Sequence, residues 1–395
     1  MIYLDSNATT QPTRRVIDAV VAALESGWHN PSSGHRLGQA ARQKMEVARQ
    51  SLAKLIGAKP REIIFTSGAT ESVNMALSGA MRAIDRSAPG TPTGIVTTPL
   101  EHEAVREAAR LATGEYESGR VRLLPVGDDG VVDAEALAAM LDGSVAVVSV
   151  QWANNETGMV QPVKRLAEIC KAKGVLFHSD ATQWVGKMPT DVSAAGIDLL
   201  SLSAHKFHGP KGVGALYARR GVRLRPLLGG SQEMERRGGT ENTSGIAGMG
   251  AAAEEAIQWL SNPAEMVRLG AMRDRLEAGI LGRVPGARVN APADGNKLEK
   301  RLWNTTNVGF PRLEAEALLM MLSERGVAAS GGAACSSGSL EPSPILAAMG
   351  VPPEYAHGSV RFSLSRDTTD AEIDEAIEIV ASCVARLRES TKSVV

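Results

Sequence analysis

A fully buried β-strand is predicted by Val145-Ala146-Val147-Val148-Ser149-Val150, an apolar, β-branched run without polar alternation. Residues 162–173 follow it with the spacing of a helix, and a second apolar run comes at residues 174–178. Working outward in both directions, similar strand-like runs occur at residues 62–66, 94–98 and 198–202. Continuous apolar strands joined by helices predict a mostly parallel central sheet with helices on both faces, which is an α/β fold.

The pattern changes after about residue 260. Long helical stretches at residues 264–281, 313–325 and 369–387 alternate with only a few strands, near residues 303–310 and 361–364. This mixture predicts a second, smaller α+β domain. We therefore assign residues 15–260 to a large domain, and residues 1–14 and 261–395 to a small domain.

Composition excludes several classes of protein. The 395 residues carry 43 Lys and Arg against 44 Asp and Glu, a formal net charge of −1, with 4% aromatic residues, so we expect no direct nucleic-acid binding. No apolar run approaches the roughly 20 residues that cross a membrane, and we expect no membrane association. Cys170, Cys335 and Cys383 are widely scattered, which argues against a disulfide framework and favours the cytoplasm.

The most specific chemistry follows two neighbouring strands. Asp180 stands at the end of one strand, in His178-Ser179-Asp180-Ala181-Thr182-Gln183, and Lys206 follows the next, in Ser203-Ala204-His205-Lys206. Open α/β sheets bind ligands at the carboxyl ends of their strands. A lysine there can form a Schiff base with an aldehyde cofactor, while a carboxylate keeps a pyridine nitrogen protonated. The alternative is a buried Asp–Lys ion pair with a structural role.

Three further polar clusters fall at strand ends. Residues 66–72, Thr-Ser-Gly-Ala-Thr-Glu-Ser, offer backbone N–H groups and hydroxyls to a phosphate, or else form an ordinary helix cap. His102 follows a strand and is either functional or a satisfied polar residue. The third cluster either belongs to the ligand site or is a simple turn; it consists of Asn154-Asn155-Glu156-Thr157-Gly158.

Taken together, these motifs resemble the cysteine desulfurases of the NifS/IscS type, in the class V aminotransferase family of fold-type I pyridoxal-phosphate enzymes. The resemblance runs nearly end to end, through residues 3–10, 30–33, 66–72, 101–102, 154–158, 178–183, 201–212, 236–242 and 335–343. It implies a pyridoxal 5′-phosphate-dependent transferase with the fold described above.

The resemblance also implies roles for individual residues. Lys206 would bind the cofactor aldehyde, Asp180 would pair with its pyridine nitrogen, and His102 would stack on its ring and shuttle protons. Gln183 and Asn154 would contact the ring hydroxyl, with Asn154 also near the substrate, and Arg361 would clamp the substrate carboxylate. The residues expected to hold the phosphate are Ala69, Thr70, Ser203, His205 and, from the second subunit of a homodimer, Thr240.

Cys335 determines the expected reaction. It lies among glycines and serines, in Gly331-Gly332-Ala333-Ala334-Cys335-Ser336-Ser337-Gly338, which indicates a loop instead of a packed core. The resemblance implies that L-cysteine yields L-alanine and a persulfide on Cys335. An aminotransferase or lyase for another amino acid, including selenocysteine, would leave Cys335 unexplained.

The partners that the resemblance implies are an iron–sulfur scaffold or a sulfur-relay acceptor protein. We expect no intrinsic metal, only a transient contact of Cys335 with an iron–sulfur cluster during sulfur delivery.

Overall fold

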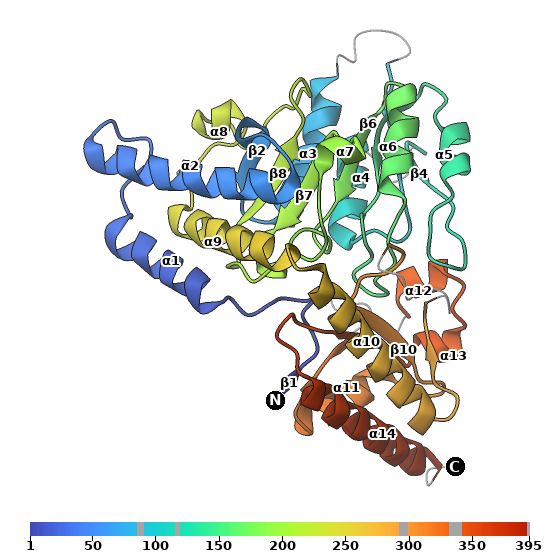
Figure 1. The fold of residues 1–395 in the computed structure, drawn as a ribbon. Coiled ribbons are helices and arrows are strands. Elements are labelled where there is room, and N and C mark those ends of the chain that lie inside the picture. The colour runs from blue at the N-terminus through green and yellow to red at the C-terminus, as the bar shows by residue number, and fades with distance from the viewer. Residues whose placement is uncertain (85–90, 115–118, 292–298, 332–341, 393–395) are drawn as a thin grey trace.

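The computed structural model describes residues 1–84, 91–114, 119–291, 299–331 and 342–392. Within these ranges a seven-stranded sheet has the order β2-β8-β7-β6-β5-β3-β4 (Figure 1). Neighbouring strands from β7 to β4 are parallel, and β8 is antiparallel to both of its neighbours. The strands are β2 (Ile63–Thr66), β3 (Gly94–Thr97), β4 (Val121–Leu123), β5 (Val145–Ser149), β6 (Leu176–Asp180), β7 (Leu199–Ser203) and β8 (Gly214–Ala218). The predicted, mostly parallel sheet is observed.

Helices cover both faces of this sheet, because its strands are apolar on both sides. In β5, Val147 packs in a cluster with Val73 of α3, whereas its neighbour Val148 packs in a cluster with Leu166 of α6. The helices of this region are α1 (Arg14–Ser26), α2 (Arg36–Ile56), α3 (Ala69–Ala83), α4 (Glu103–Thr113), α5 (Ala134–Met140), α6 (Val163–Ala172), α7 (Val192–Ala195), α8 (Gln232–Glu235) and α9 (Thr243–Leu260), with 3₁₀ turns η1 (Pro60–Glu62) and η2 (Ala204–Lys206).

A second part of the chain is built around an antiparallel sheet of order β12-β13-β10-β9 among the described residues. Its strands are β9 (Arg288–Val289), β10 (Thr305–Gly309), β12 (Ser330–Gly331) and β13 (Ser359–Ser363). Its helices are α10 (Pro263–Arg283), α11 (Ala315–Glu324), α12 (Pro344–Ala348), α13 (Pro353–Ala356) and α14 (Asp370–Lys392).

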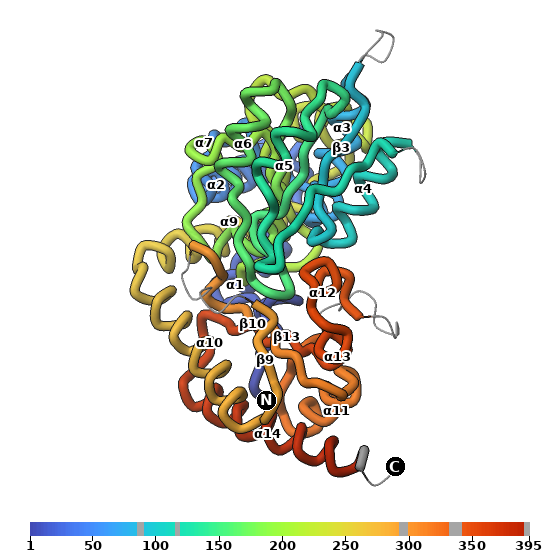
Figure 2. Tube along the Cα trace, turned by 90° about the vertical axis from the view of Figure 1, so that its right-hand side faces the viewer, coloured from blue at the N-terminus to red at the C-terminus, as the bar shows by residue number. Residues whose placement is uncertain are grey.

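The N-terminus belongs to this second part of the fold. Strand β1 (Ile2–Tyr3) pairs in parallel with β11 (Val327–Ala328), so the N-terminus lies in the same lower body as α11 and α14 (Figure 2). This arrangement agrees with grouping residues 1–14 with the C-terminal region, although the boundaries at residues 14 and 260 stay a prediction.

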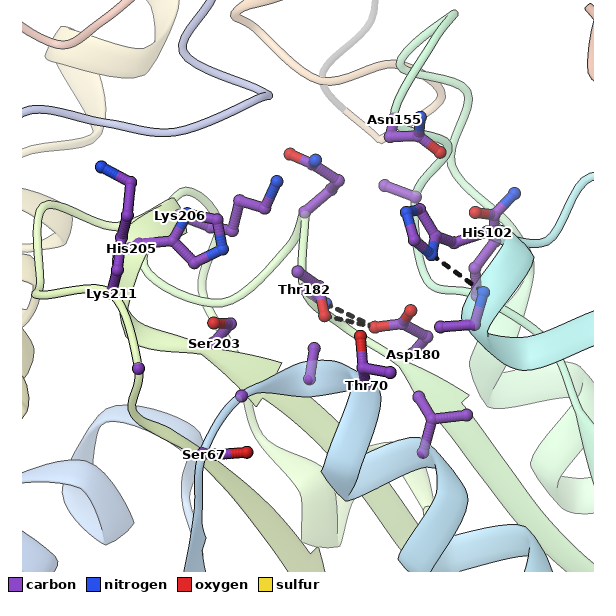
Figure 3. A pocket seen from close by; sticks show the side chains of 18 residues that line it. Ser67, Thr70, His102, Asn155, Asp180, Thr182, Ser203, His205, Lys206 and Lys211 are labelled. Atoms are coloured by element: carbon purple, nitrogen blue, oxygen red, sulfur yellow. Dashed lines mark hydrogen bonds between the residues drawn. The ribbon is translucent and has the colours of Figure 1, made fainter. Parts of the chain in front are cut away.

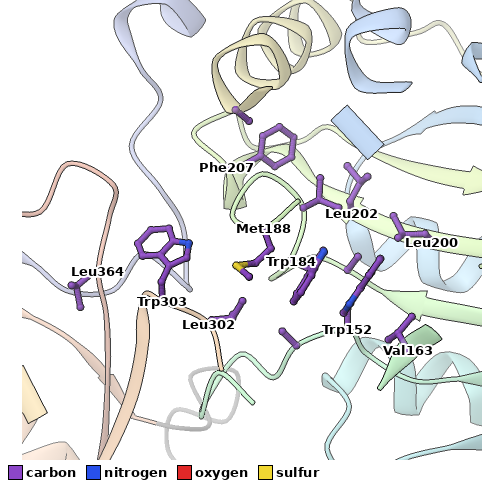
Figure 4. Close-up of a cluster of buried hydrophobic side chains, with 14 of the residues drawn as sticks. Trp152, Val163, Trp184, Met188, Leu200, Leu202, Phe207, Leu302, Trp303 and Leu364 are labelled. Atoms are coloured by element: carbon purple, nitrogen blue, oxygen red, sulfur yellow. The ribbon is translucent and has the colours of Figure 1, made fainter. Parts of the chain in front are cut away.

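One hydrophobic core joins the two parts. Trp152 and Trp184 stack with their ring centroids 4.8 Å apart beneath the central sheet (Figure 4). The same buried cluster continues through Met188 to Leu302 and Trp303 of the second part. Because apolar surface from both parts is removed from water together, we expect them to unfold cooperatively.

Two glycines let the chain turn sharply at one edge of the central sheet. Gly68 follows β2, and Gly214 begins β8 beside it. A Cβ atom on Gly214 would lie 2.6 Å from the Gly68 Cα atom, so position 214 has no room for a larger residue, whereas a Cβ atom on Gly68 would only contact Ser203 Oγ at 3.8 Å. This contact sets α3 directly above the ends of the strands.

Candidate active site

A pocket of about 370 Å³ opens at the carboxyl ends of the parallel strands (Figure 3). Residues from the ends of β2, β6 and β7 meet there, as expected for an open α/β sheet. The pocket brings together Ala69, Thr70, His102, Asp180, Gln183, Ser203, His205 and Lys206 among the residues singled out from the sequence.

Asp180 is the last residue of β6 and is buried. We expected the strand at residues 174–178, but it begins two residues later because Gly174, at φ 69°, still belongs to the turn after α6. The backbone N–H and the hydroxyl of Thr182 both donate to Asp180 Oδ1, and these bonds fix the carboxylate in the pocket.

His178 lies on the same strand, two residues before Asp180. Its ring nitrogens are 2.8 Å from Ser149 Oγ and 3.1 Å from Ser201 Oγ. Burial lowers the pKa of His178 to about 4, so its ring is neutral at physiological pH. The neutral His178 ring therefore adds no positive charge beside Asp180.

Lys206 ends the 3₁₀ turn η2 that follows β7. Its Nζ atom donates to the carbonyl oxygens of Asn7, at 2.7 Å, and Ala8, at 2.9 Å. The N-terminal segment thus contributes directly to the position of this amine.

Asn7 also binds a second lysine. Lys187 is wholly buried, and its Nζ donates to Asn7 Oδ1 at 2.8 Å and to Gln183 Oε1 at 2.6 Å. Burial, with Lys206 and Arg361 nearby, lowers the pKa of Lys187 well below its ordinary value. Gln183 Nε2 donates to the Asn7 carbonyl oxygen, so its amide orientation is fixed at both ends. Sequence reasoning missed Lys187, because nothing in a local motif reveals its burial.

His102 caps the N-terminus of α4 and faces the pocket (Figure 3). Its Nδ1 accepts from the Ala104 N–H at 3.1 Å, so the proton of the neutral ring sits on Nε2. Burial is the main cause that lowers the pKa of His102, which favours this neutral form.

Glu101, beside it, is completely buried. Its Oε1 accepts from Thr98 Oγ1 and the Gln151 N–H, whereas its Oε2 has no hydrogen-bond partner in the described part of the chain. Burial raises the pKa of Glu101 to about 8, with a further contribution from Asp180.

One end of the pocket suits an anion. The first turn of the 15-residue helix α3 starts at Ala69 and Thr70, where free backbone N–H groups meet the positive end of the helix dipole. Ser203 and His205 line the same pocket. Burial and the nearby Lys206 and Lys211 lower the pKa of His205 to about 4. Ser67, from the anticipated cluster at residues 66–72, and Lys211 also line the pocket, although we assigned neither of them a role of its own from the sequence.

The structure places Asn155, instead of the anticipated Asn154, on the pocket wall (Figure 3). The Asn154 side chain is used inside the turn: Nδ2 donates to the Leu100 carbonyl oxygen at 3.1 Å, and Oδ1 accepts from the N–H groups of Glu156 and Thr157. By contrast, Asn155 Oδ1 is buried and has no partner among the described residues, as expected for a side chain that a bound group would satisfy. The sequence shows both asparagines, but it does not show which of the two side chains faces the pocket.

Two anticipated residues do not line this pocket, and nothing is described of a third. Arg361, in β13, is buried and donates to Asp5 Oδ1 at 2.8 Å and to the Asn155 carbonyl oxygen at 3.2 Å. Thr240 is exposed and does not line the pocket of its own chain. Cys335 lies outside the described residues.

The donor set fits pyridoxal 5′-phosphate. An amine, a carboxylate and an anion-binding helix N-terminus surround one cavity, and these groups match the aldehyde, the pyridine nitrogen and the phosphate of that cofactor. Asn155 Oδ1 adds a buried polar atom that still lacks a partner in the described structure.

Comparison with known proteins identifies the class. The aminotransferase class-V family model matches residues 2–376, and the chain belongs to this family. Its cysteine desulfurases are enzymes that depend on pyridoxal 5′-phosphate. The family, the fold class and the enzyme class predicted from the sequence are thereby confirmed.

Individual proteins of this family are similar to the chain over nearly its whole length. The cysteine desulfurase NifS of Azotobacter vinelandii is 46% identical, over 98% of this chain and 93% of that protein. A solved NifS-like protein is 36% identical, with a TM-score of 0.87, over 97% of this chain and 99% of its own. The structure of SspA in complex with cysteine is 30% identical, with a TM-score of 0.76, over 92% of this chain and 99% of its own.

No helix in the described ranges combines the length and the apolar character needed to cross a membrane.

Proposed function

We propose that this chain is a pyridoxal 5′-phosphate-dependent cysteine desulfurase that converts L-cysteine into L-alanine and retains the sulfur as a persulfide on Cys335. The observation that carries the proposal is the convergence of Lys206, Asp180 and His102 on one pocket with an anion-binding end. The relative from Azotobacter vinelandii, named as a cysteine desulfurase, and the SspA structure with bound cysteine support the substrate.

The pocket residues would hold the cofactor at three points. Bound there, pyridoxal 5′-phosphate would supply an aldehyde that reacts with amines and a ring that accepts an electron pair. Lys206 would be the amine, Asp180 would pair with the pyridine nitrogen, and His102 would stack on the ring. Gln183 and Asn155 would contact the ring hydroxyl. The residues that would hold the phosphate are Ala69, Thr70, Ser203 and His205.

Proton transfer falls to two groups. Lys206 Nζ and His102 Nε2 both belong to side chains that line the pocket; the amine can take the proton removed from the substrate Cα, and Nε2, which carries the proton of the neutral ring, can donate one. The His102 ring is neutral, because burial lowers its pKa and because Nδ1 accepts a hydrogen bond from the Ala104 N–H.

The substrate carboxylate is assigned to Arg361. Its Nε atom is buried without a partner in the described part of the chain, and its Nη1 atom reaches the Asn155 backbone beside the pocket. A carboxylate bound here would satisfy Nε, and the guanidinium geometry suits two-point recognition.

Sulfur transfer needs a thiolate and no outside oxidant. The Cys335 thiolate attacks the substrate Sγ; the S–S bond forms as the Cβ–Sγ bond breaks, and the bonding pair remains on Cβ, where a proton completes the methyl group of alanine. The net change is L-cysteine plus Cys335–SH giving L-alanine plus Cys335–S–SH, which balances in atoms and electrons.

The active unit is a homodimer in which Thr240 of one subunit completes the phosphate site of the other. Its exposed position, away from its own pocket, supports this role. Sulfur then passes to an iron–sulfur scaffold or a sulfur-relay protein in the cytoplasm.

The test is reconstitution of the purified chain with pyridoxal 5′-phosphate, followed by separate measurement of alanine, sulfane sulfur and keto acids from L-cysteine. We expect equal amounts of alanine and sulfane sulfur. Cys335→Ala should keep the bound cofactor and its spectral response to cysteine but form no persulfide. Lys206→Ala should lose the borohydride-stable attachment of the cofactor, seen by mass spectrometry.

Cys383→Ala serves as the matched control, because Cys383 is buried in α14. It should transfer sulfur like the parent. Persulfide formation by Cys335→Ala at the parental rate, or a keto acid as the main product, would contradict the proposal.

A further inference from the structure

The turn at residues 154–158 contacts both the pocket and a distant part of the chain. The Asn154 side chain ties the N–H groups of Glu156 and Thr157 to the Leu100 carbonyl oxygen. Held this way, the turn places Asn155 on the pocket wall, while the next residue, Glu156, is 3% exposed and contacts a different part of the chain.

That contact is Ser343, which lies 187 residues further along the chain. The Ser343 hydroxyl donates to Glu156 Oε2 at 2.6 Å. Ser343 Oγ also accepts from the N–H groups of Ile345 and Leu346 at the start of α12. Ser343 is itself 5% exposed. One hydroxyl therefore both caps α12 and joins it to the turn beside the pocket.

Apolar packing supports the same junction. Ile345 and Leu346 of α12 are buried in one cluster with Leu100, whose carbonyl oxygen holds Asn154. Helix α12 is thus fixed to the pocket turn by a buried hydrogen bond and by the side chains around it.

The junction between Glu156 and Ser343 is close in sequence to Cys335 on its Ser343 side. Ser343 comes eight residues after Cys335. On the other side of Cys335, Gly331 of β12 pairs with Val360 of β13, the residue next to Arg361. On one side of residues 332–341, Ser343 is therefore held against the turn that carries Asn155, and on the other side Gly331 is held against the strand that carries Arg361.

We propose that Glu156 is a positioning residue for sulfur transfer: by accepting the Ser343 hydrogen bond, it holds the chain downstream of Cys335 against the turn that carries Asn155. This inference rests on the proposed function. Glu156 takes no part in bond making. Burial raises its pKa, whereas the Ser343 hydrogen bond and the nearby Arg361 and Arg106 act in the opposite direction.

The variants separate this hydrogen bond from other roles. Glu156→Leu removes the acceptor but leaves the α12 cap, and Glu156→Gln keeps an oxygen that Ser343 can reach. Ser343→Ala removes both contacts, and Ser343→Thr restores the hydroxyl. Asp133→Ala is the control for a lost helix cap, because Asp133 Oδ1 accepts from the N–H groups of Glu135 and Ala136 without contacting the turn.

Two rates are compared in each holoenzyme: the spectral change on mixing with L-cysteine, and persulfide formation on Cys335 in a single turnover, followed by mass spectrometry. In Glu156→Leu and Ser343→Ala we expect persulfide formation to slow roughly tenfold, as for loss of a buried hydrogen bond, with the spectral change preserved. Glu156→Gln, Ser343→Thr and Asp133→Ala should stay close to the parent.

Hydrogen exchange in the cofactor-free chain gives an independent readout. Exchange across α12 should be faster in Glu156→Leu than in Glu156→Gln. Parental persulfide rates in Glu156→Leu would overturn the inference, and so would an equal loss of the spectral change, which would assign Glu156 to the pocket itself. If the parent enzyme forms no persulfide, the proposed function fails instead.

Discussion

Glu101 illustrates how much one side chain next to the pocket depends on its surroundings. It is wholly buried, only one of its oxygens has partners in the described chain, and its pKa is raised to about 8. The carboxyl is therefore mostly protonated at neutral pH.

This predicts a pH-dependent difference between the parent and Glu101→Gln. A carboxyl whose pKa rises from 4.5 to about 8 on folding binds more protons in the native state, so its contribution to stability is lost as pH rises through that window. The free energy of unfolding of Glu101→Gln should thus rise relative to the parent between pH 4.5 and 8, by an amount on the order of 5 kcal/mol.

Urea unfolding of the cofactor-free chains at several pH values measures this difference. A constant difference across the range would contradict the raised pKa. The amide of Glu101→Gln does not titrate, so any free energy that it costs is the same at every pH. It therefore cancels when the differences measured at two pH values are compared.

At this scale the sequence predicts some site residues well and others not at all. Asp180 and Lys206 could be found because each follows a strand whose apolar pattern is plain, and strand ends converge in an α/β sheet. Asn155 and Lys187 could not, because the choice between two adjacent asparagines and the burial of a lysine depend on contacts with Leu100 and Asn7, which are distant in sequence.

Among the elements, strand β2 at the sheet edge has an unusual partner. The N–H of Phe65 donates to Glu233 Oε2, and the carbonyl oxygen of Ile63 accepts from Arg49 Nη1. Arg49 and Glu233 also pair with each other through two hydrogen bonds of 2.8 Å. This ion pair satisfies edge groups that another strand would otherwise bind.

Breaking this pair should be costly. Glu233→Leu leaves the Arg49 guanidinium, 5% exposed, with only the partly exposed Glu46 as a counter-charge, and we expect a loss of about 3 kcal/mol in the free energy of unfolding. Urea unfolding of Glu233→Leu, Arg49→Met and the double variant measures it. The double variant should lose much less than the sum of the two single losses. Additive losses would show that the pair does not act as a unit.

Local patterns explain why the long helices were anticipated and α8 was not. Helix α1 begins at the Thr13 cap and ends at Gly27, both visible in the sequence. In α8, Glu233, Met234 and Glu235 adopt φ values of 47°, 59° and 62°. No propensity rule assigns such angles to these residue types, because the buried Arg49 contact imposes them.

For the whole molecule, large apolar side chains are exposed on α1, on α2 and in the segment between them. Trp28, in that segment, is 68% exposed and Leu24 of α1 is 59% exposed, with Ile17, Leu37 and Val47 also exposed. A second copy of the chain would remove such side chains from water, which supports the proposed homodimer.

The doubly substituted Leu24→Glu/Trp28→Glu chain should therefore become monomeric, because two charges would have to be buried in the interface. Light scattering after size exclusion measures the mass, and equilibrium dialysis measures retention of pyridoxal 5′-phosphate. Retention should fall together with dimerisation, since Thr240 then no longer reaches the neighbouring site. Met320→Glu, which changes a residue that is 68% exposed on α11, should leave both unchanged. A dimeric double variant would exclude this surface as the interface.

The junction at Asn7 has a consequence for how the protein is made. Asn7 bonds to Thr305 and Ser363, partners 298 and 356 residues away, while its carbonyl oxygen positions Lys206. A ribosome must therefore release nearly the entire polypeptide before the reactive amine is held in place. We expect vitamin B6 to be captured only after translation ends, so that truncated products do not sequester the vitamin.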